Sequence, residues 1–186
     1  YEIDLWGRVR RSFEAAQAEA QASVADYENI LLTLTADIAV NYFLVRSLDA
    51  EIETLRQTLE SREATLRILN ERFSAGVLLG SDVEQANTAL ATTKADLADV
   101  IRQRTETLHA LAVLCGAPAS TFRIPEQPLT GVPVIVPAEL PSALLERRPD
   151  IARAERNLIA RNAQIGVARA AYFPSLHLTA QGGFLS

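Results

Sequence analysis

The sequence predicts a mainly α-helical protein: a long antiparallel coiled-coil α-hairpin, a third helix along the N-terminal half of its first helix, and short β-strand ends. Two observations lead to this fold class. Neither Pro nor Gly occurs between Arg8 and Ala75, and neither occurs again in residues 82–114. Because both residues commonly break helices, each stretch can form one continuous helix.

Apolar residues follow a heptad pattern in the second half of the first stretch. Spacings of three and four alternate through Val45, Leu48, Ile52, Leu55, Leu59, Arg62, Leu66, Leu69 and Phe73, and Arg62 is the only polar member. An ordinary amphipathic helix is the alternative, but the sustained register favours a coiled coil. The whole helix would be on the order of 100 Å long.

A sharp turn is expected where Gly76 and Gly80 bracket three apolar residues. Ser81 and Glu84 match a capping box at the start of a second helix over residues 82–114. The second helix has its own apolar seam, which includes Val83, Leu90, Leu97 and Leu108, and reversal at residue 78 sets the two seams opposite each other. Arg62 and Arg104 then interrupt these seams, as residues that fix the register or face a further neighbour.

The remaining chain reads as a connector followed by a third helix. Residues 117–141 are rich in Pro and include a candidate strand at 132–136, and a short helix is expected at 142–147. Asp150 beside Pro149 suits the first turn of a helix that ends near Tyr172. Run antiparallel to the first helix, this third helix would cover Val24, Tyr27, Ile30, Leu31, Leu34 and Ile38.

Alternation of apolar and polar residues indicates strand ends at Tyr1–Leu5 and at residues 176–184. The chain contains no Met and opens within the first of these patterns, so we expect it to be a fragment of a longer protein. No apolar run reaches the roughly 20 residues of a membrane-spanning helix. The net charge of −5 argues against nucleic acid as a partner, and the single Cys115 cannot build a disulfide framework or a thiolate zinc site.

Four blocks of sequence resemble the outer-membrane efflux protein family, the TolC-like proteins, and within it the lipoprotein branch typified by OprM and NodT. The blocks are Glu2–Arg10, Arg72–Ala86 at the turn, Leu144–Ile151 and Ile165–Leu176. Together they extend over essentially the whole chain in the order that the family has.

This resemblance implies a homotrimer that forms one 12-stranded outer-membrane β-barrel continued by a periplasmic α-helical barrel. Residues 1–6 would end one barrel strand, 7–116 would form the periplasmic hairpin, 117–148 the equatorial connector, 149–173 the third helix, and 174–186 would begin the next strand. The expected location is the outer membrane of a Gram-negative bacterium, with this part mostly periplasmic.

By the same resemblance, the protein is the passive channel of a tripartite efflux system for drugs or other small solutes. An inner-membrane pump of the resistance-nodulation-division type supplies the energy, and a periplasmic adaptor docks at the hairpin tip. The expected docking residues are Gly76, Val77, Leu78, Leu79, Gly80, Ser81 and Asp82. Local packing of the apolar turn is the alternative interpretation of this segment.

No enzyme, cofactor or metal site is expected. His109 and His177 have no metal-spaced neighbours and read as structural residues. A run of arginines interleaved with acids reads as a solvated or inter-subunit face, with anion binding as the alternative: Arg147, Arg148, Arg153, Arg156, Arg161 and Arg169. Two other functions stay open, a periplasmic coiled-coil adaptor of the membrane fusion type and a hydrolase hidden in the connector.

Overall fold

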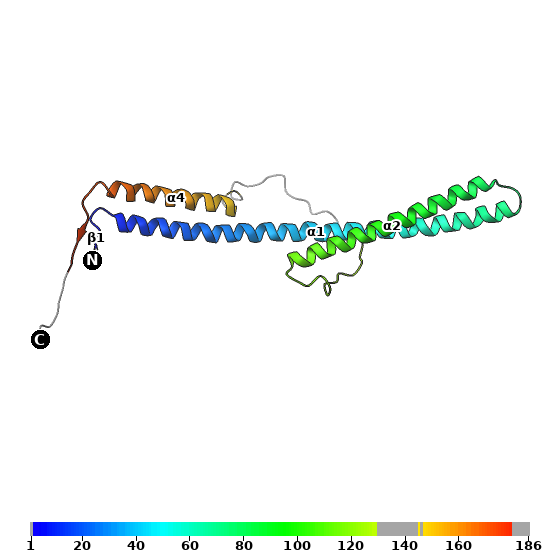
Figure 1. Ribbon diagram of the computed structural model, residues 1–186, viewed down its shortest axis with the longest axis horizontal. Helices are drawn as coiled ribbons and strands as arrows, with labels where there is room; N and C mark the ends of the chain where they lie inside the picture. Colours follow the sequence, from blue (N-terminus) through cyan, green and yellow to red (C-terminus); the bar gives the residue numbers. More distant parts are fainter. Residues whose placement is uncertain (1, 130–144, 146, 180–186) are drawn as a thin grey trace. The chain divides into compact units, whose positions relative to one another are not determined.

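The computed structural model describes residues 2–129, 145 and 147–179. The chain divides into a terminal unit, Tyr1–Thr33 with Ile135–Ser186, and a hairpin unit, Leu34–Val134. Three helices and two short strands are described: α1 (Arg8–Ser74), α2 (Gly80–Leu114), α4 (Pro149–Ala170), β1 (Glu2–Ile3) and β2 (Leu176–His177) (Figure 1). The mainly helical fold class predicted from the sequence is confirmed.

Helix α1 runs without interruption from Arg8 to Ser74, one residue short of the expected end. It contains a stretch that is long and apolar enough to cross a membrane by length and composition, and most of that stretch is exposed. The expectation that no segment passes this test was wrong. Its apolar residues are separated by single polar residues, so a count of consecutive apolar positions missed them.

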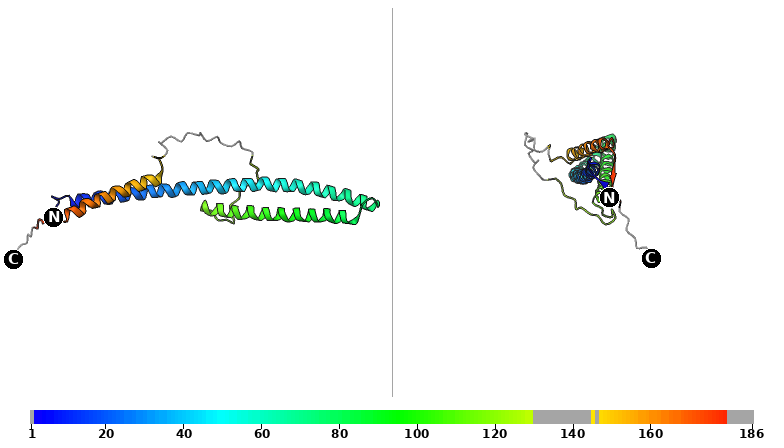
Figure 2. Two further views of the ribbon diagram at one scale, coloured as in Figure 1. Left: turned by 90° about the horizontal axis from the view of Figure 1, so that it is seen from above. Right: turned by 90° about the vertical axis from the view of Figure 1, so that its left-hand side faces the viewer.

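In the hairpin unit, α2 lies antiparallel beside the second part of α1 (Figures 1 and 2). The seam residues Leu48 and Ile52 of α1 are buried against Val100 of α2, and Leu55 and Leu97 pack around them. Burying such aliphatic side chains contributes roughly 1.5–3 kcal/mol each. The Leu48–Leu55 part of the predicted seam therefore forms the core of this unit.

Both interrupting arginines of the seams reach across the hairpin. Arg62 of α1 donates a hydrogen bond to the backbone carbonyl of Ala89 in α2, and Arg104 of α2 donates to the Asp49 carboxylate of α1. Helix α2 ends where the sequence predicts, because Gly116 adopts a left-handed φ of 67°. Its N–H donates to the Val113 carbonyl at 3.0 Å.

In the terminal unit, α4 lies beside the first part of α1 in both views (Figures 1 and 2). Their contact is made of small residues that are all buried: Ala15, Ala18, Ala22 and Ala25 of α1 with Ala160, Ala163 and Ala170 of α4. An Arg153–Asp26 ion pair of 2.6 Å and a Gln164–Glu19 hydrogen bond of 3.3 Å flank it. Alanine side chains let the two helices approach closely.

This alanine seam corrects one expectation. The sequence assigned the third helix to cover large apolar residues, yet Val24, Tyr27, Ile30 and Leu31 stay exposed, while Leu34 and Ile38 are half-buried. The alanines occupy the other face of α1, so the large side chains of this region point away from that seam. They form an exposed apolar face on the terminal unit.

Strands β1 and β2 pair antiparallel, with Glu2 opposite His177 and Ile3 opposite Leu176. This pairing joins the segment before α1 to the segment after α4. The candidate strand at 132–136, most of the short helix at 142–147 and the end of the strand expected at 176–184 lie outside the described residues.

Candidate functional site

The hairpin tip is a five-residue turn, Ala75–Leu79, between α1 and α2. Gly76 adopts a φ of 75°, and its N–H donates to the Phe73 carbonyl at 2.9 Å. The Val77 N–H donates to the Arg72 carbonyl at 3.0 Å. These two bonds form a Schellman motif, which satisfies the last carbonyls of α1 and fixes the direction in which the chain leaves the helix.

The tip presents two large apolar side chains to solvent. Val77 and Leu79 are each 73% exposed, whereas Leu78 between them is half-buried. A Cβ built on Gly80 would lie 3.6 Å from the Phe73 ring, so this aromatic side chain packs against the start of α2. The turn is thus held by local packing at Phe73 while Val77 and Leu79 point outward.

The capping box expected at Ser81 is not formed. Helix α2 begins at Gly80, its N-cap is Leu79 in an extended conformation, and no side chain caps it. Ser81 therefore lies inside the first turn. Asp82 also lies in this turn, where its N–H donates to the Leu79 carbonyl at 3.2 Å and its negative charge is favoured by the helix dipole. Of the seven expected docking residues, the last three belong to α2.

A second cluster of side chains lies in the hairpin unit, around Asp49. Its side chain is fully buried, and Arg46 and Arg104 beside it are 9% and 11% exposed. One carboxylate oxygen of Asp49 accepts from Nε of Arg104 at 2.5 Å; the other accepts from Nη1 of Arg46 at 3.2 Å and from the Gln127 backbone N–H at 3.1 Å. Both carboxylate oxygens of Asp49 therefore accept hydrogen bonds.

Both arginines also hold the connector that follows α2. Arg46 donates to the Pro125 carbonyl at 2.8 Å, and Arg104 donates to the Ile124 carbonyl at 3.1 Å. The guanidinium of Arg46 lies 5.0 Å from the centre of the Tyr42 ring. We call Arg46, Asp49 and Arg104 the connector clamp, because the three side chains tie the connector to the hairpin. Because the three side chains are at most 11% exposed, their burial favours a structural role for this cluster.

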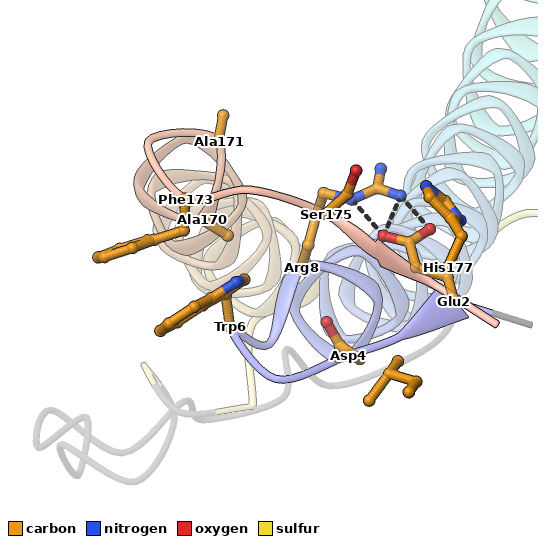
Figure 3. A pocket seen from close by; sticks show the side chains of 10 residues that line it. Glu2, Asp4, Trp6, Arg8, Ala170, Ala171, Phe173, Ser175 and His177 are labelled. Atoms are coloured by element: carbon orange, nitrogen blue, oxygen red, sulfur yellow. Dashed lines mark hydrogen bonds and ion pairs between the residues drawn. The ribbon is translucent and has the colours of Figure 1, made fainter.

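A third region lies where β1 and β2 meet the helices. Here the Trp6 and Phe173 rings stack with their centres 4.4 Å apart (Figure 3). The Trp6 indole N–H donates to the Pro174 carbonyl at 3.0 Å. The Asp4 carboxylate accepts from the backbone N–H groups of Val9 at 3.1 Å and Arg10 at 2.9 Å, which caps α1.

Ion pairs also stabilise this region where the two strands meet the helices, which we call the junction. Arg8 donates to both oxygens of Glu2, at 2.7 and 2.5 Å from its Nη2 atom (Figure 3). Hydrogen bonding from Arg8 lowers the pKa of Glu2 below its ordinary value of 4.5, and the Arg10 backbone N–H lowers the pKa of Asp4 below its ordinary 3.8. Glu2, Asp4 and Arg8 line a cavity of about 280 Å³. The motif blocks Glu2–Arg10 and Ile165–Leu176 thus meet in one place.

The other residues considered from the sequence are dispersed. His109 is exposed on α2, His177 pairs with Glu2 across the strands, and Cys115 is an exposed free thiol at the end of α2. No group of His, Cys, Asp and Glu that could hold a metal ion occurs in the described part of the chain. The arginine run divides: Arg148 pairs with Asp150 at 2.8 Å, and Arg153 pairs with Asp26.

Sequence reasoning missed the connector clamp. Asp49 follows the seam leucine Leu48 directly, and aspartate is mostly exposed in folded proteins. The one signal available was Arg104, a cation inside an apolar seam, since a buried cation requires a nearby anion. Which acidic residue pairs with Arg104 depends on how the two helices face each other.

Comparison with known proteins places the chain in a family. The family model described as "Outer membrane efflux protein" matches residues 1–117 and 140–185. Toluene efflux pump outer membrane protein TtgF of Pseudomonas putida is 36% identical over 190 residues, which is 100% of this chain and 39% of that protein. The chain therefore spans about two fifths of the relative's length.

Solved structures show the same fold. The CmeC outer membrane channel of Campylobacter jejuni superposes with a TM-score of 0.83 at 27% identity, over 94% of this chain and 38% of that one. The outer membrane protein VceC of Vibrio cholerae superposes with a TM-score of 0.80 at 28% identity, over 94% of this chain and 41% of that one.

Proposed function

Because the chain belongs to the outer membrane efflux protein family, we propose that it is the periplasmic segment of the outer-membrane channel of a tripartite efflux system. In this proposal the whole protein is a passive duct for drugs or other small solutes and carries out no reaction. The observation that carries the proposal is the match of the family across both the hairpin and the terminal unit, including the tip.

Pairing of the two strands supports a barrel at one end of the terminal unit. β1 and β2 are antiparallel neighbours in register, and their connecting segments pass through the Trp6–Phe173 stack into α1 and α4. Antiparallel neighbours are what an up-and-down barrel requires. We propose that residues 1–6 end one barrel strand and that residues 174–186 begin the next, with 7–116 as the hairpin, 117–148 as the connector and 149–173 as the third helix.

Exposed apolar side chains support assembly of the whole protein as a homotrimer. An isolated soluble chain rarely leaves so many large apolar residues in water. Those of the terminal-unit helices that are at least half exposed are Phe13, Val24, Tyr27, Ile30, Leu32, Leu158 and Ile165. Their burial between protomers of a closed helical barrel would remove the cost of this exposure.

The tip supports docking of a periplasmic adaptor, through which the inner-membrane pump would be coupled. Val77 and Leu79 form a small apolar knob on a backbone that the Schellman motif and the Phe73 contact hold in place. A preformed knob loses little conformational entropy when it is buried by a partner. The docking site in this proposal extends from Gly76 to Asp82.

Two observations argue against the adaptor and hydrolase alternatives. The family that matches is that of the outer membrane channels, and the match covers both units of the chain. His109 and His177, the residues that a hydrolase would need, lie in different units.

The test is export by the full-length protein in cells that carry the cognate pump and adaptor but lack their own channel. We expect the unaltered protein to restore efflux of a fluorescent solute, and deletion of residues 76–81 to abolish it while trimer levels in the outer membrane stay unchanged. Normal efflux after this deletion would rule out docking at the tip. Failure of the unaltered trimer to restore any efflux would count against the duct itself.

A further inference from the structure

A groove of about 430 Å³ lies beside the junction, between the start of α1 and the end of α4. Its lining includes Arg10, Arg11, Glu14, Arg169, Trp6 and Phe173, and we call it the arginine groove. We propose that it binds the phosphate of an anionic phospholipid headgroup at the periplasmic face of the membrane. This inference rests on the proposed function, which places the strand ends in an outer membrane.

The residues that line the arginine groove carry more positive than negative charge, which favours binding of an anion. Three guanidinium groups line it, and Glu14 is the one carboxylate among its lining residues. Glu14 lies 2.7 Å from Arg11. Arg10 lies 3.4 Å from the Asp4 carboxylate, which already caps α1. Arg169 forms no ion pair with any residue that the structure describes.

A glycine inside α4 shapes this groove. A Cβ on Gly166 would lie 2.9 Å from Cγ and 3.1 Å from Cδ of Arg11, so the Arg11 side chain lies directly across the glycine. Glycine in the middle of a helix costs about 1 kcal/mol relative to alanine. Here it gives Arg11 a place on the surface of α4. Arg169 is three residues further along and shares that face, since residues at i and i+3 are neighbours on a helix.

Aromatic and aliphatic side chains border the arginines. Trp6, Phe173 and Leu5 line the groove beside them; the two aromatic residues are about half exposed and Leu5 is 57% exposed. Trp is enriched where a membrane meets water, because one end of its ring system is apolar and the other is polar. Arginine beside such residues can bind a phosphate while its aliphatic stem stays against the acyl chains. The groove combines both features.

A lipid headgroup suits this chemistry better than a free phosphate ion. A small anion would use the arginines alone and leave the exposed aromatic border in water. A phospholipid would engage both. Because the chain as a whole carries a net charge of −5, its overall field opposes binding to an anionic surface, and such binding requires a local site.

The test measures binding of the chain to vesicles of phosphatidylcholine alone and of phosphatidylcholine with about 30% phosphatidylglycerol. The groove variant is Arg10→Gln/Arg11→Gln/Arg169→Gln. Its control is Arg67→Gln/Arg72→Gln/Arg123→Gln, in which three exposed arginines of the hairpin unit are replaced. Both variants remove three positive charges, so a difference between them reports where the charges lie and not how many there are. Helix content and the thermal unfolding midpoint check that both variants fold.

We expect tighter binding to the anionic vesicles, a loss of at least about tenfold in the groove variant, and a change within about twofold in the control. Inorganic phosphate at the same phosphate concentration should not displace the chain. Equal weakening of both variants, or equal binding to both kinds of vesicle, would overturn the proposal; displacement by inorganic phosphate would overturn its assignment to a lipid. The assay needs neither pump nor adaptor, so its failure is distinguishable from failure of the duct.

Discussion

The Asp49 carboxylate of α1 accepts a 2.5 Å hydrogen bond from Nε of Arg104 on α2, and the Asp49 side chain is fully shielded from solvent. Arg46 and the backbone of Gln127 supply its other donors. One aspartate therefore joins both helices of the hairpin and the connector. Removing it would leave two cations with little access to water and no anion beside them.

Asp49→Ala should destabilise the hairpin unit by about 3–5 kcal/mol, the range found when one partner of a buried ion pair is removed. Urea unfolding followed by circular dichroism measures this. Asp99→Ala is the matched control, because Asp99 pairs with Arg102 at 2.7 Å on the exposed face of α2, where solvent screens the pair. Equal losses in the two variants would show that the connector clamp adds no more stability than an exposed ion pair.

Ala18→Leu should weaken the packing of α1 against α4 by roughly 1–3 kcal/mol, since Ala18 is 4% exposed in the alanine seam and has no room for a larger side chain. Ala20→Leu makes the same change at an exposed position of the same helix. Thermal unfolding of both variants measures the difference in their stability. A stability for Ala18→Leu equal to that of Ala20→Leu would refute close packing of these helices.

These two seams show what the sequence could and could not reveal. Leucine and valine at heptad spacing between helix breakers predicted the hairpin, because large apolar side chains at this spacing are usually buried against a partner helix. The alanines at 15, 18, 22 and 25 follow a similar spacing, but alanine is common on every face of a helix and gives a weak signal. The larger Val24 and Tyr27 gave the stronger signal and predicted the wrong face, since both stay exposed.

The tip was located from its two glycines, yet its details depend on backbone geometry that the sequence does not specify. Gly76→Ala should destabilise the hairpin by about 1 kcal/mol, because Gly76 has a φ of 75° that residues with a Cβ adopt at a cost. Gly80→Ala is the control: Gly80 lies in the first turn of α2, and its added Cβ would only touch Phe73. Similar unfolding midpoints for both variants would contradict the left-handed turn.

Acid should open the junction around Trp6. The pKa values of Glu2 and Asp4 are lower in the folded chain than their ordinary 4.5 and 3.8, so their contribution to stability is present above those values. It is lost as the pH falls through the lowered folded-state values. Trp6 is the single tryptophan, so its fluorescence reports the junction directly.

We expect this fluorescence to be constant from pH 7 to about pH 5 and to change below about pH 4. In Asp4→Asn, which cannot ionise and caps α1 more weakly, the acid-induced change should be smaller. A transition centred near neutral pH would contradict the assignment of the two carboxylates.

The most direct test of the duct proposal is photo-cross-linking from the tip of the full-length trimer in cells that contain the pump and adaptor. A photoreactive amino acid at Val77 or Leu79 should give an adduct with the periplasmic adaptor, because both side chains are exposed on a fixed turn. The same label at Val113, which is 72% exposed far along α2, should give none. Adaptor adducts from Val113 without adducts from Val77 or Leu79 would contradict docking at the hairpin tip.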